Sequence, residues 1–129
     1  MKRALIIVAL AAATVAAGRH GTPLQQAPKE TAAIANPLEG SENARLAGRK
    51  LFERECAYCH GPNGEGKPGG APPLKRPDVC SAPPGALFWV LRNGSLRGGM
   101  PSFAHLPEPE RWQIVTYIRS LLPEDKHGK

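Results

Sequence analysis

Residues 56–60 read CAYCH, and this pentapeptide holds two of the three cysteines in a chain of 129 residues. A histidine follows the second cysteine directly, so two thiols and one imidazole lie within about one turn of chain. Such a group serves in three kinds of site: a zinc site, a redox-active dithiol and the attachment point of a cofactor. The rest of the sequence is needed to choose among them.

The three kinds of site differ in what they require elsewhere. A zinc site usually takes four ligands from two Cys/His pairs, and the sequence offers no second pair. A thioredoxin-type dithiol needs a βαβ setting, and no strand pattern is present. Covalent haem needs only the motif itself, because the thiols of Cys56 and Cys59 add to the two vinyl groups and His60 becomes an axial iron ligand. This pattern favours one covalent haem c with its iron.

The N-terminal stretch predicts export. Lys2 and Arg3 precede an apolar run over residues 4–17, which is the layout of a secretory signal peptide with cleavage near Ala17. The run is shorter than the ~20 residues that span a membrane as a helix. An N-terminal anchor that stays uncleaved is the alternative. We therefore predict a signal peptide over residues 1–17 and a periplasmic location.

The remainder divides into a leader, one domain and a tail. Residues 18–40 show no sustained periodicity, which predicts a flexible leader or tether. Residues 41–124 form the predicted domain, and residues 125–129 a disordered tail. So small a domain commonly needs a metal, disulfides or a cofactor to fold stably, and three cysteines exclude a multi-disulfide framework.

The net charge of +6 and its distribution along the sequence indicate which classes of binding partner to expect. The basic residues are scattered and are not interleaved with aromatic residues, so no nucleic-acid partner is expected. A mildly basic surface instead favours docking to acidic protein partners. Membrane contact is expected only if the leader is not cleaved, and the expected oligomeric state is a monomer.

Three helices are predicted in the domain. Ser41 is the predicted N-cap of a first helix that runs into the cysteine pair. A second helix is predicted over residues 85–92, with its end at Asn93-Gly94. The last begins near Pro107–Pro109 and continues to Leu121–Leu122, where the following proline stops it.

Between the first two helices, residues 61–84 are rich in proline and glycine and fit no helix or strand of ordinary length. Such a loop suits a chain that wraps a ligand in place of a core of its own. Cys80 lies in this segment and is expected to be a small buried residue. The alternatives are a free surface thiol and an intermolecular disulfide.

The sixth iron ligand can be sought by elimination. Once the signal peptide is removed, Met100 is the only methionine left. Two glycines precede it, which allows a close approach to a flat ligand, and Pro101 restrains the backbone after it. Met100 is therefore the predicted ligand opposite His60, and His105 is the alternative.

Several motifs occur in order along the domain: G-x-x-L-F (48–52), C-x-x-C-H-G (56–61), A-P-P-L (71–74), R-N-G (92–94), G-M-P-x-F (99–103) and R-W-Q-I-V-T-Y-I-R-S-L (111–121). Together they resemble a small class I cytochrome c over residues 44–122. The resemblance implies an all-α, cytochrome c-like fold, in which three or more short helices and long Pro/Gly loops wrap one covalent haem.

The resemblance also implies contacts within the protein. The first and last helices should cross closely, with Gly48 and Phe52 meeting Ile114 and Tyr117. The Nδ1–H of the haem histidine should donate to the carbonyl of Pro72, or else of Pro73. Further residues are expected around the haem, by packing or at a propionate: Leu74, Leu87, Leu91, and Arg97 or Trp89.

The function implied is that of an electron carrier rather than an enzyme. The expected partners are redox proteins: a donor dehydrogenase, and an acceptor oxidase or another cytochrome. One alternative is a haem subunit of a larger dehydrogenase or oxidase complex. Another is a small haem peroxidase or gas sensor with a labile sixth ligand.

Overall fold

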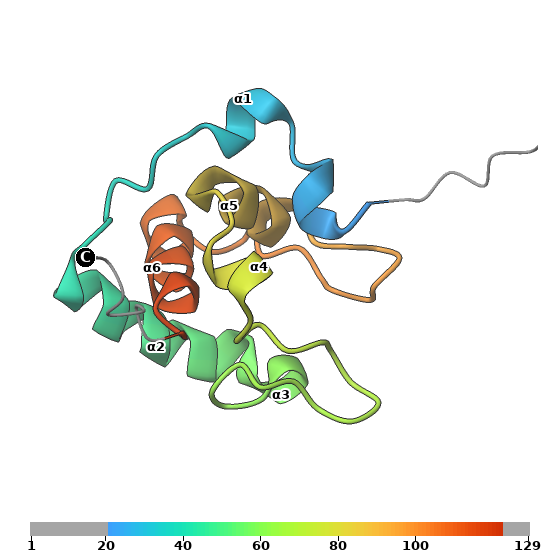
Figure 1. Cartoon of the computed structure of the whole chain (residues 1–129). Coiled ribbons are helices and arrows are strands. Elements are labelled where there is room, and N and C mark those ends of the chain that lie inside the picture. Colours follow the sequence, from blue (N-terminus) through green and yellow to red (C-terminus); the bar gives the residue numbers. More distant parts are fainter. Residues whose placement is uncertain (1–20, 123–129) are drawn as a thin grey trace, which may run out of the picture.

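A computed structural model describes residues 21–122 (Figure 1). Within this range the chain is helical and has no strand, which confirms the predicted all-α class. The predicted signal peptide and the C-terminal tail lie outside the described residues. The elements in order are η1 (Pro23–Gln26), α1 (Lys29–Ala32), α2 (Glu42–Glu55), α3 (Ala57–His60), α4 (Pro77–Cys80), α5 (Pro84–Asn93) and α6 (Glu108–Arg119).

Helices α2 and α5 form where the sequence predicts them. The hydroxyl oxygen of Ser41 accepts a hydrogen bond from the backbone N–H of Ala44 at 3.1 Å, so the predicted N-cap is confirmed. Helix α5 ends at Asn93, because Gly94 takes a φ of +68° that favours glycine. Both helices are amphipathic and turn their apolar sides to one core.

Helix α6 ends earlier than predicted. The sequence predicts that it continues to Leu121–Leu122, but its last residue is Arg119 and Ser120 is its C-cap. The backbone N–H of Ser120 donates to the carbonyl of Tyr117 at 2.9 Å, and that of Leu121 to Ile118 at 3.1 Å. These bonds span three residues instead of four, so the chain leaves the helix in tighter turns before it reaches the proline.

Helices α2 and α6 cross at close range and form the centre of the fold (Figure 1). A Cβ at Gly48 would lie 1.9 Å from the carbonyl oxygen of Gln113 and 3.0 Å from the Cβ of Tyr117. The rings of Phe52 and Tyr117 lie 5.2 Å apart, and Phe52 and Ile114 are fully buried. The predicted crossing is confirmed, and the residue that Gly48 touches most closely is Gln113.

Residues 21–40, here called the N-terminal strap, correct the expectation of a flexible leader. Its helices η1 and α1 pack against α5, and Leu24 and Leu38 pack on the core. Asn36 is buried and bonded to helix α6. The strap holds to the domain through a few widely spaced residues, which is why its sequence shows no periodicity. Residues 18–20 lie outside the described part.

The Pro/Gly segment contains one short helical turn, α4, and otherwise runs as loop. Cys80 in this turn is 7% exposed, and its thiol donates to the carbonyl of Leu74 at 3.4 Å. This confirms that Cys80 is a small buried residue. Over residues 21–122, no helix has the length and apolar character needed to cross a membrane.

Candidate functional site

The two cysteines of CAYCH lie one helical turn apart at the junction of α2 and α3. Cys56 ends α2, and its carbonyl accepts hydrogen bonds from the backbone N–H groups of Cys59 and His60 at 3.2 and 3.0 Å. The thiols differ in their surroundings, because Cys56 is 6% exposed whereas Cys59 lies at the surface. Burial raises the pKa of the Cys56 thiol to about 12, with a smaller contribution from the neighbouring Glu55, so the unmodified thiol stays protonated near neutral pH.

His60 is oriented by the loop that follows it. Its Nδ1 lies 3.1 Å from the carbonyl oxygen of Pro72, and because a carbonyl only accepts, Nδ1 carries the proton. The Nε2 lone pair is then the one left for a metal ion. This contact joins the two groups that the family resemblance implied. Pro73, the alternative, makes no such contact with His60 in the structure.

The loop that presents the Pro72 carbonyl closes on itself tightly. The backbone N–H of Gly66 donates to the carbonyl of His60 at 2.6 Å, and that of Leu74 to Gly64 at 2.7 Å. Gly66 has a φ of +79°, and a Cβ there would lie 2.8 Å from the backbone nitrogen of Pro73. Position 66 therefore needs glycine both for its dihedral angle and for the space.

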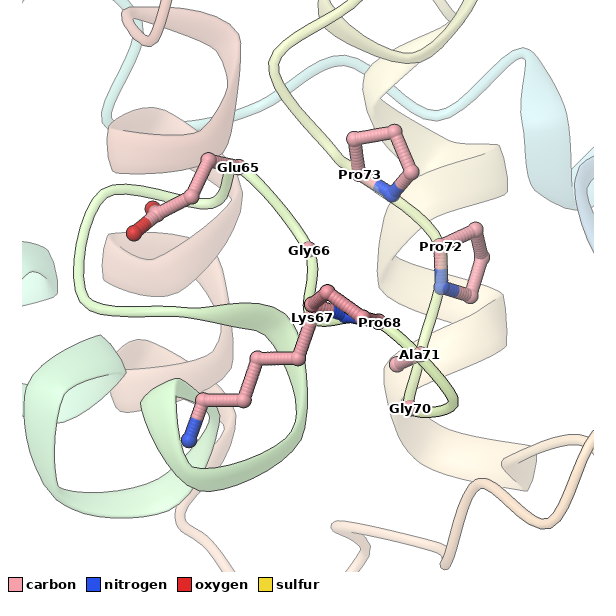
Figure 2. Close-up of a pocket in the computed structure, with 8 residues that line it drawn as sticks. All are labelled: Glu65, Gly66, Lys67, Pro68, Gly70, Ala71, Pro72 and Pro73. Carbon is pink, nitrogen blue, oxygen red and sulfur yellow. The ribbon is translucent and has the colours of Figure 1, made fainter.

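An open pocket of about 430 Å³ lies inside this loop. In Figure 2 the two prolines at 72 and 73 stand on one arm of the loop, and Lys67 and Pro68 on the other. The ammonium of Lys67 lies 5.3 Å from the centre of the exposed Tyr58 ring. Neither cysteine and neither predicted iron ligand lines this pocket. It is formed by the loop that positions His60 and is not the place where the iron would bind.

Met100 is held at the end of α5. Its backbone exchanges two hydrogen bonds with Ser95, at 2.9 and 3.0 Å. Two residues later the hydroxyl of Ser102 donates to the carbonyl of Arg92 at 2.5 Å, and the N–H of Phe103 donates to Leu91 at 2.8 Å. The side chain of Met100 is partly buried and packs against the core cluster.

The other predicted residues occupy different environments. Leu87 and Leu91 are buried in the core at 6% and 3% exposure, and Leu74 is partly buried against it. Arg97 is exposed, and Trp89 is half-buried on α5. His105, the alternative iron ligand, is exposed and lies beside Phe103, with the ring centres 5.9 Å apart.

These residues suit covalent haem better than a bare metal ion. Two thiols at the right spacing, an imidazole with its Nε2 unengaged and a partly buried thioether supply every protein group that a c-type haem uses. In the part of the chain that the structure describes, no group of three His, Cys, Asp or Glu side chains is placed to hold a metal ion. The zinc alternative thus finds no ligand set there.

The sequence alone does not reveal several residues that hold the loop around Met100. Gly94 was predicted only as a helix stop, yet a Cβ there would lie 2.6 Å from the carbonyl oxygen of Met100. Ser102 and Phe103 were given no role, although both bond to the end of α5. In the sequence, the one sign of this contact is that Ser102 and Phe103 follow the R-N-G motif (92–94) within about ten residues.

Comparisons with known proteins agree with this chemistry. Residues 43–118 match the family model described as cytochrome C oxidase, cbb3-type, subunit III. Among solved structures, the chain is similar to cytochrome cL from the marine methylotrophic bacterium Methylophaga aminisulfidivorans, with 28% identity and a TM-score of 0.56. The similarity covers 67% of this chain and 58% of that one. No curated protein sequence is similar enough to this one to count as a match.

Proposed function

Since the chain belongs to the family of c-type cytochrome domains described as cbb3-type oxidase subunit III, and so binds haem c covalently, we propose that it is a periplasmic electron carrier with His60 and Met100 as axial ligands. Membership of the family supports haem-based electron transfer. The identity of the ligands, the location and the absence of enzymatic activity form the proposal.

The observation that supports this proposal is that hydrogen bonds restrain both of the proposed ligands. A hydrogen bond to the carbonyl of Pro72 holds the ring of His60 in one tautomer, and backbone bonds to Ser95 hold Met100. When bound, the haem iron accepts and releases one electron between Fe(III) and Fe(II). Because a thioether favours Fe(II), a Met100 ligand raises the reduction potential.

The other side chains of the site serve to keep water away and to anchor the group. Cys56 and Cys59 form the two thioether links. Leu74, Leu87 and Leu91 are the apolar residues proposed to pack on the haem, where a low dielectric disfavours the more highly charged ferric state. Arg97, which forms no ion pair within residues 21–122, is the proposed donor to a propionate.

Docking to redox partners is proposed to use the basic loops near CAYCH. All three arginines of α2 form ion pairs on the same helix, whereas Lys67 and Lys75 have no ion-pair partner in the described part of the chain. The side chain of Tyr58 is 87% exposed beside Lys67. A donor dehydrogenase and an acceptor oxidase or cytochrome with acidic surfaces would suit these loops, through a small interface that dissociates quickly.

A spectrum and a mass test the proposal. Protein purified from its native periplasm should carry one haem, which adds about 616 Da to the polypeptide. The same mass shows whether residues 1–17 have been removed. The oxidised protein should show a weak absorption band at about 695 nm from the methionine–iron bond, here called the methionine–iron band.

Two substitutions identify the ligand. Met100→Ala should abolish the methionine–iron band and lower the potential, because the thioether is lost. His105→Ala is the matched control and should leave both unchanged. If the band and the potential survive in Met100→Ala, the ligand has been assigned wrongly.

A second candidate function is that of a haem subunit of a larger oxidase or dehydrogenase. The description of the matched family, which names an oxidase subunit, is the observation that favours it. Co-purification with a large catalytic chain from the native membrane or periplasm would support this function, and isolation as a monomer would support the free carrier.

A further inference from the structure

The N-terminal strap lies before the region that matches the family model, which begins at residue 43. In Figure 1 it runs from η1 through α1 along α5 and then reaches α2. Both of its short helices pack against α5. The strap is therefore an addition to the matched domain that touches the helix leading to Met100.

Helix α1 lies very close to α5 at Gly85. A Cβ at this position would lie 1.9 Å from the carbonyl oxygen of Thr31 and 2.9 Å from that of Ala32. Both atoms belong to the backbone, so they cannot rotate away as a side chain would. Glycine is ordinarily unfavourable in a helix, and here its lack of a side chain lets the strap lie directly on α5.

Asn36 fastens the strap to α6. Its side-chain nitrogen donates to the hydroxyl oxygen of Thr116 at 2.8 Å, and its side-chain oxygen accepts from the backbone N–H of Leu38 at 2.9 Å. The hydroxyl of Thr116 in turn donates to the carbonyl of Trp112 at 2.8 Å. Asn36 is only 6% exposed, so these bonds are shielded from water.

The part of α6 around Trp112 also packs against α5. The indole of Trp112 stacks on the ring of Phe88, with the ring centres 4.1 Å apart and the planes 17° from parallel. The guanidinium of Arg111 lies 4.7 Å from the centre of the same ring. The strap, α6 and α5 therefore pack against one another: the strap contacts Gly85 of α5 and Thr116 of α6, and Trp112 of α6 stacks on Phe88 of α5.

The other end of α5 leads into residues 94–103, here called the methionine loop. The carbonyls of Leu91 and Arg92 accept hydrogen bonds from Phe103 and Ser102, and Met100 lies in the loop between. Any shift of α5 therefore moves the attachment points of this loop. The loop that carries Met100 is thus bonded to one end of α5, and the strap lies against Gly85 near the other end.

We propose that Gly85 and Asn36 are positioning residues, through which the strap holds α5 and so keeps Met100 in place as the sixth ligand. The inference rests on the proposed ligation by Met100. A loosened strap allows local opening of the methionine loop without unfolding the rest of the domain. The strap thus sets how rarely the sixth position opens to external ligands.

The test uses the holoprotein with Gly85→Ala and, separately, Asn36→Ala. Each variant is oxidised and mixed with saturating imidazole, so that the rate of binding reports how often Met100 leaves its position. Loss of one buried hydrogen-bonded amide should raise this rate about tenfold. Gly85→Ala should do at least as much, because the alanine pushes the strap backbone away from α5.

Ser41→Ala is the matched control. It removes the N-cap of α2, lowers stability by a comparable amount and touches neither α5 nor the methionine loop. It should lower the melting temperature and leave the imidazole rate unchanged. Loss of stability in the strap variants with a wild-type imidazole rate would overturn the inference.

Two outcomes separate this inference from the proposed ligation. If the wild-type protein has no methionine–iron band, the ligation itself fails, and the strap inference fails with it before any variant is made. If the band is present but neither strap variant speeds imidazole binding, only the strap inference fails. If Gly85→Ala does not mature with haem, Asn36→Ala alone decides, since it removes an amide without adding bulk.

Discussion

Gly48 of helix α2 lies against the backbone of Gln113 in helix α6, so closely that a Cβ on Gly48 would be 1.9 Å from the Gln113 carbonyl oxygen. Because the second atom belongs to a helix backbone, the two helices must separate to admit even a methyl group. This contact sets the distance between the helices that bury Phe52 and Ile114.

Gly48→Ala should therefore destabilise the protein, by about 1–3 kcal/mol, as overpacking of a close contact does. In an exposed helix position the same change would stabilise by up to about 1 kcal/mol, so the sign itself is informative. Unfolding of the oxidised holoprotein in guanidinium measures the change. Lys50→Ala, at an exposed position on the same helix, should alter stability little. An unchanged or raised stability in Gly48→Ala would contradict the close crossing.

The hydrogen bond between His60 and Pro72 can be weakened through the loop. Gly66→Ala crowds the backbone nitrogen of Pro73 and should displace the Pro72 carbonyl from the imidazole. A weaker bond at Nδ1 makes His60 a poorer electron donor, which favours Fe(II). We expect the reduction potential to rise by about 60 mV, a tenfold change for one electron.

Gly69→Ala is the matched control for this prediction. Gly69 has a similar φ of +71° in the same loop, but a Cβ there meets nothing within 4 Å. It bears the strain of a positive φ without the crowding, so its potential should stay close to that of the wild type. Equal shifts in the two variants would mean that backbone strain, and not the hydrogen bond, sets the potential.

Tyr117 should make the free energy of unfolding fall at alkaline pH. Burial raises the pKa of its phenol above the ordinary value of about 10, so the folded protein holds this proton more tightly than the unfolded chain does. The stabilisation is complete below pH ~10 and is lost as the pH rises through the folded pKa. Chemical unfolding of wild type and Tyr117→Phe at a series of pH values from 8 to 11 isolates this contribution. The stability difference between the two should change only at the alkaline end, and a constant difference would contradict it.

Loss of the haem should expose the Pro/Gly loop first. Residues 61–76 contain no helix and depend on a few backbone bonds, so they have little to hold them without the cofactor. Protein made with Cys56→Ala and Cys59→Ala should be cut within this loop by a protease of low specificity, and its helical circular dichroism should fall. The holoprotein should resist under the same conditions, and equal resistance of both would contradict the idea that the haem serves as the core.

Helix ends set by neighbouring residues were predicted from the sequence, whereas features set by contacts with distant residues were not. The start of α2 and the end of α5 were predicted because a capping serine and a glycine stop act within one turn. The end of α6 was predicted wrongly, because turn bonds after Arg119 end the helix before the expected proline. The strap was missed because Leu24, Asn36 and Leu38 make contacts with distant helices and form no period of their own.

The chemistry of the site follows from the sequence, because covalent attachment needs only neighbouring residues. Cys56, Cys59 and His60 are specified by their spacing, and the lone methionine after the signal peptide makes Met100 the proposed partner of His60. For the two cysteines and His60 this information is complete within five residues, whereas Met100 follows by elimination along the chain. It needs no knowledge of how the chain returns on itself.

The supports of that chemistry depend on the tertiary structure. Only the folded chain brings the end of α5 to the methionine loop and the strap backbone to Gly85. It also joins the Pro72 carbonyl to the imidazole, a contact that the family resemblance implies but that no local pattern specifies. These contacts join segments that share no sequence pattern, and the strap and Gly85 are also far apart in the chain. Close packing in three dimensions determines which of them meet, and composition and periodicity carry no record of it.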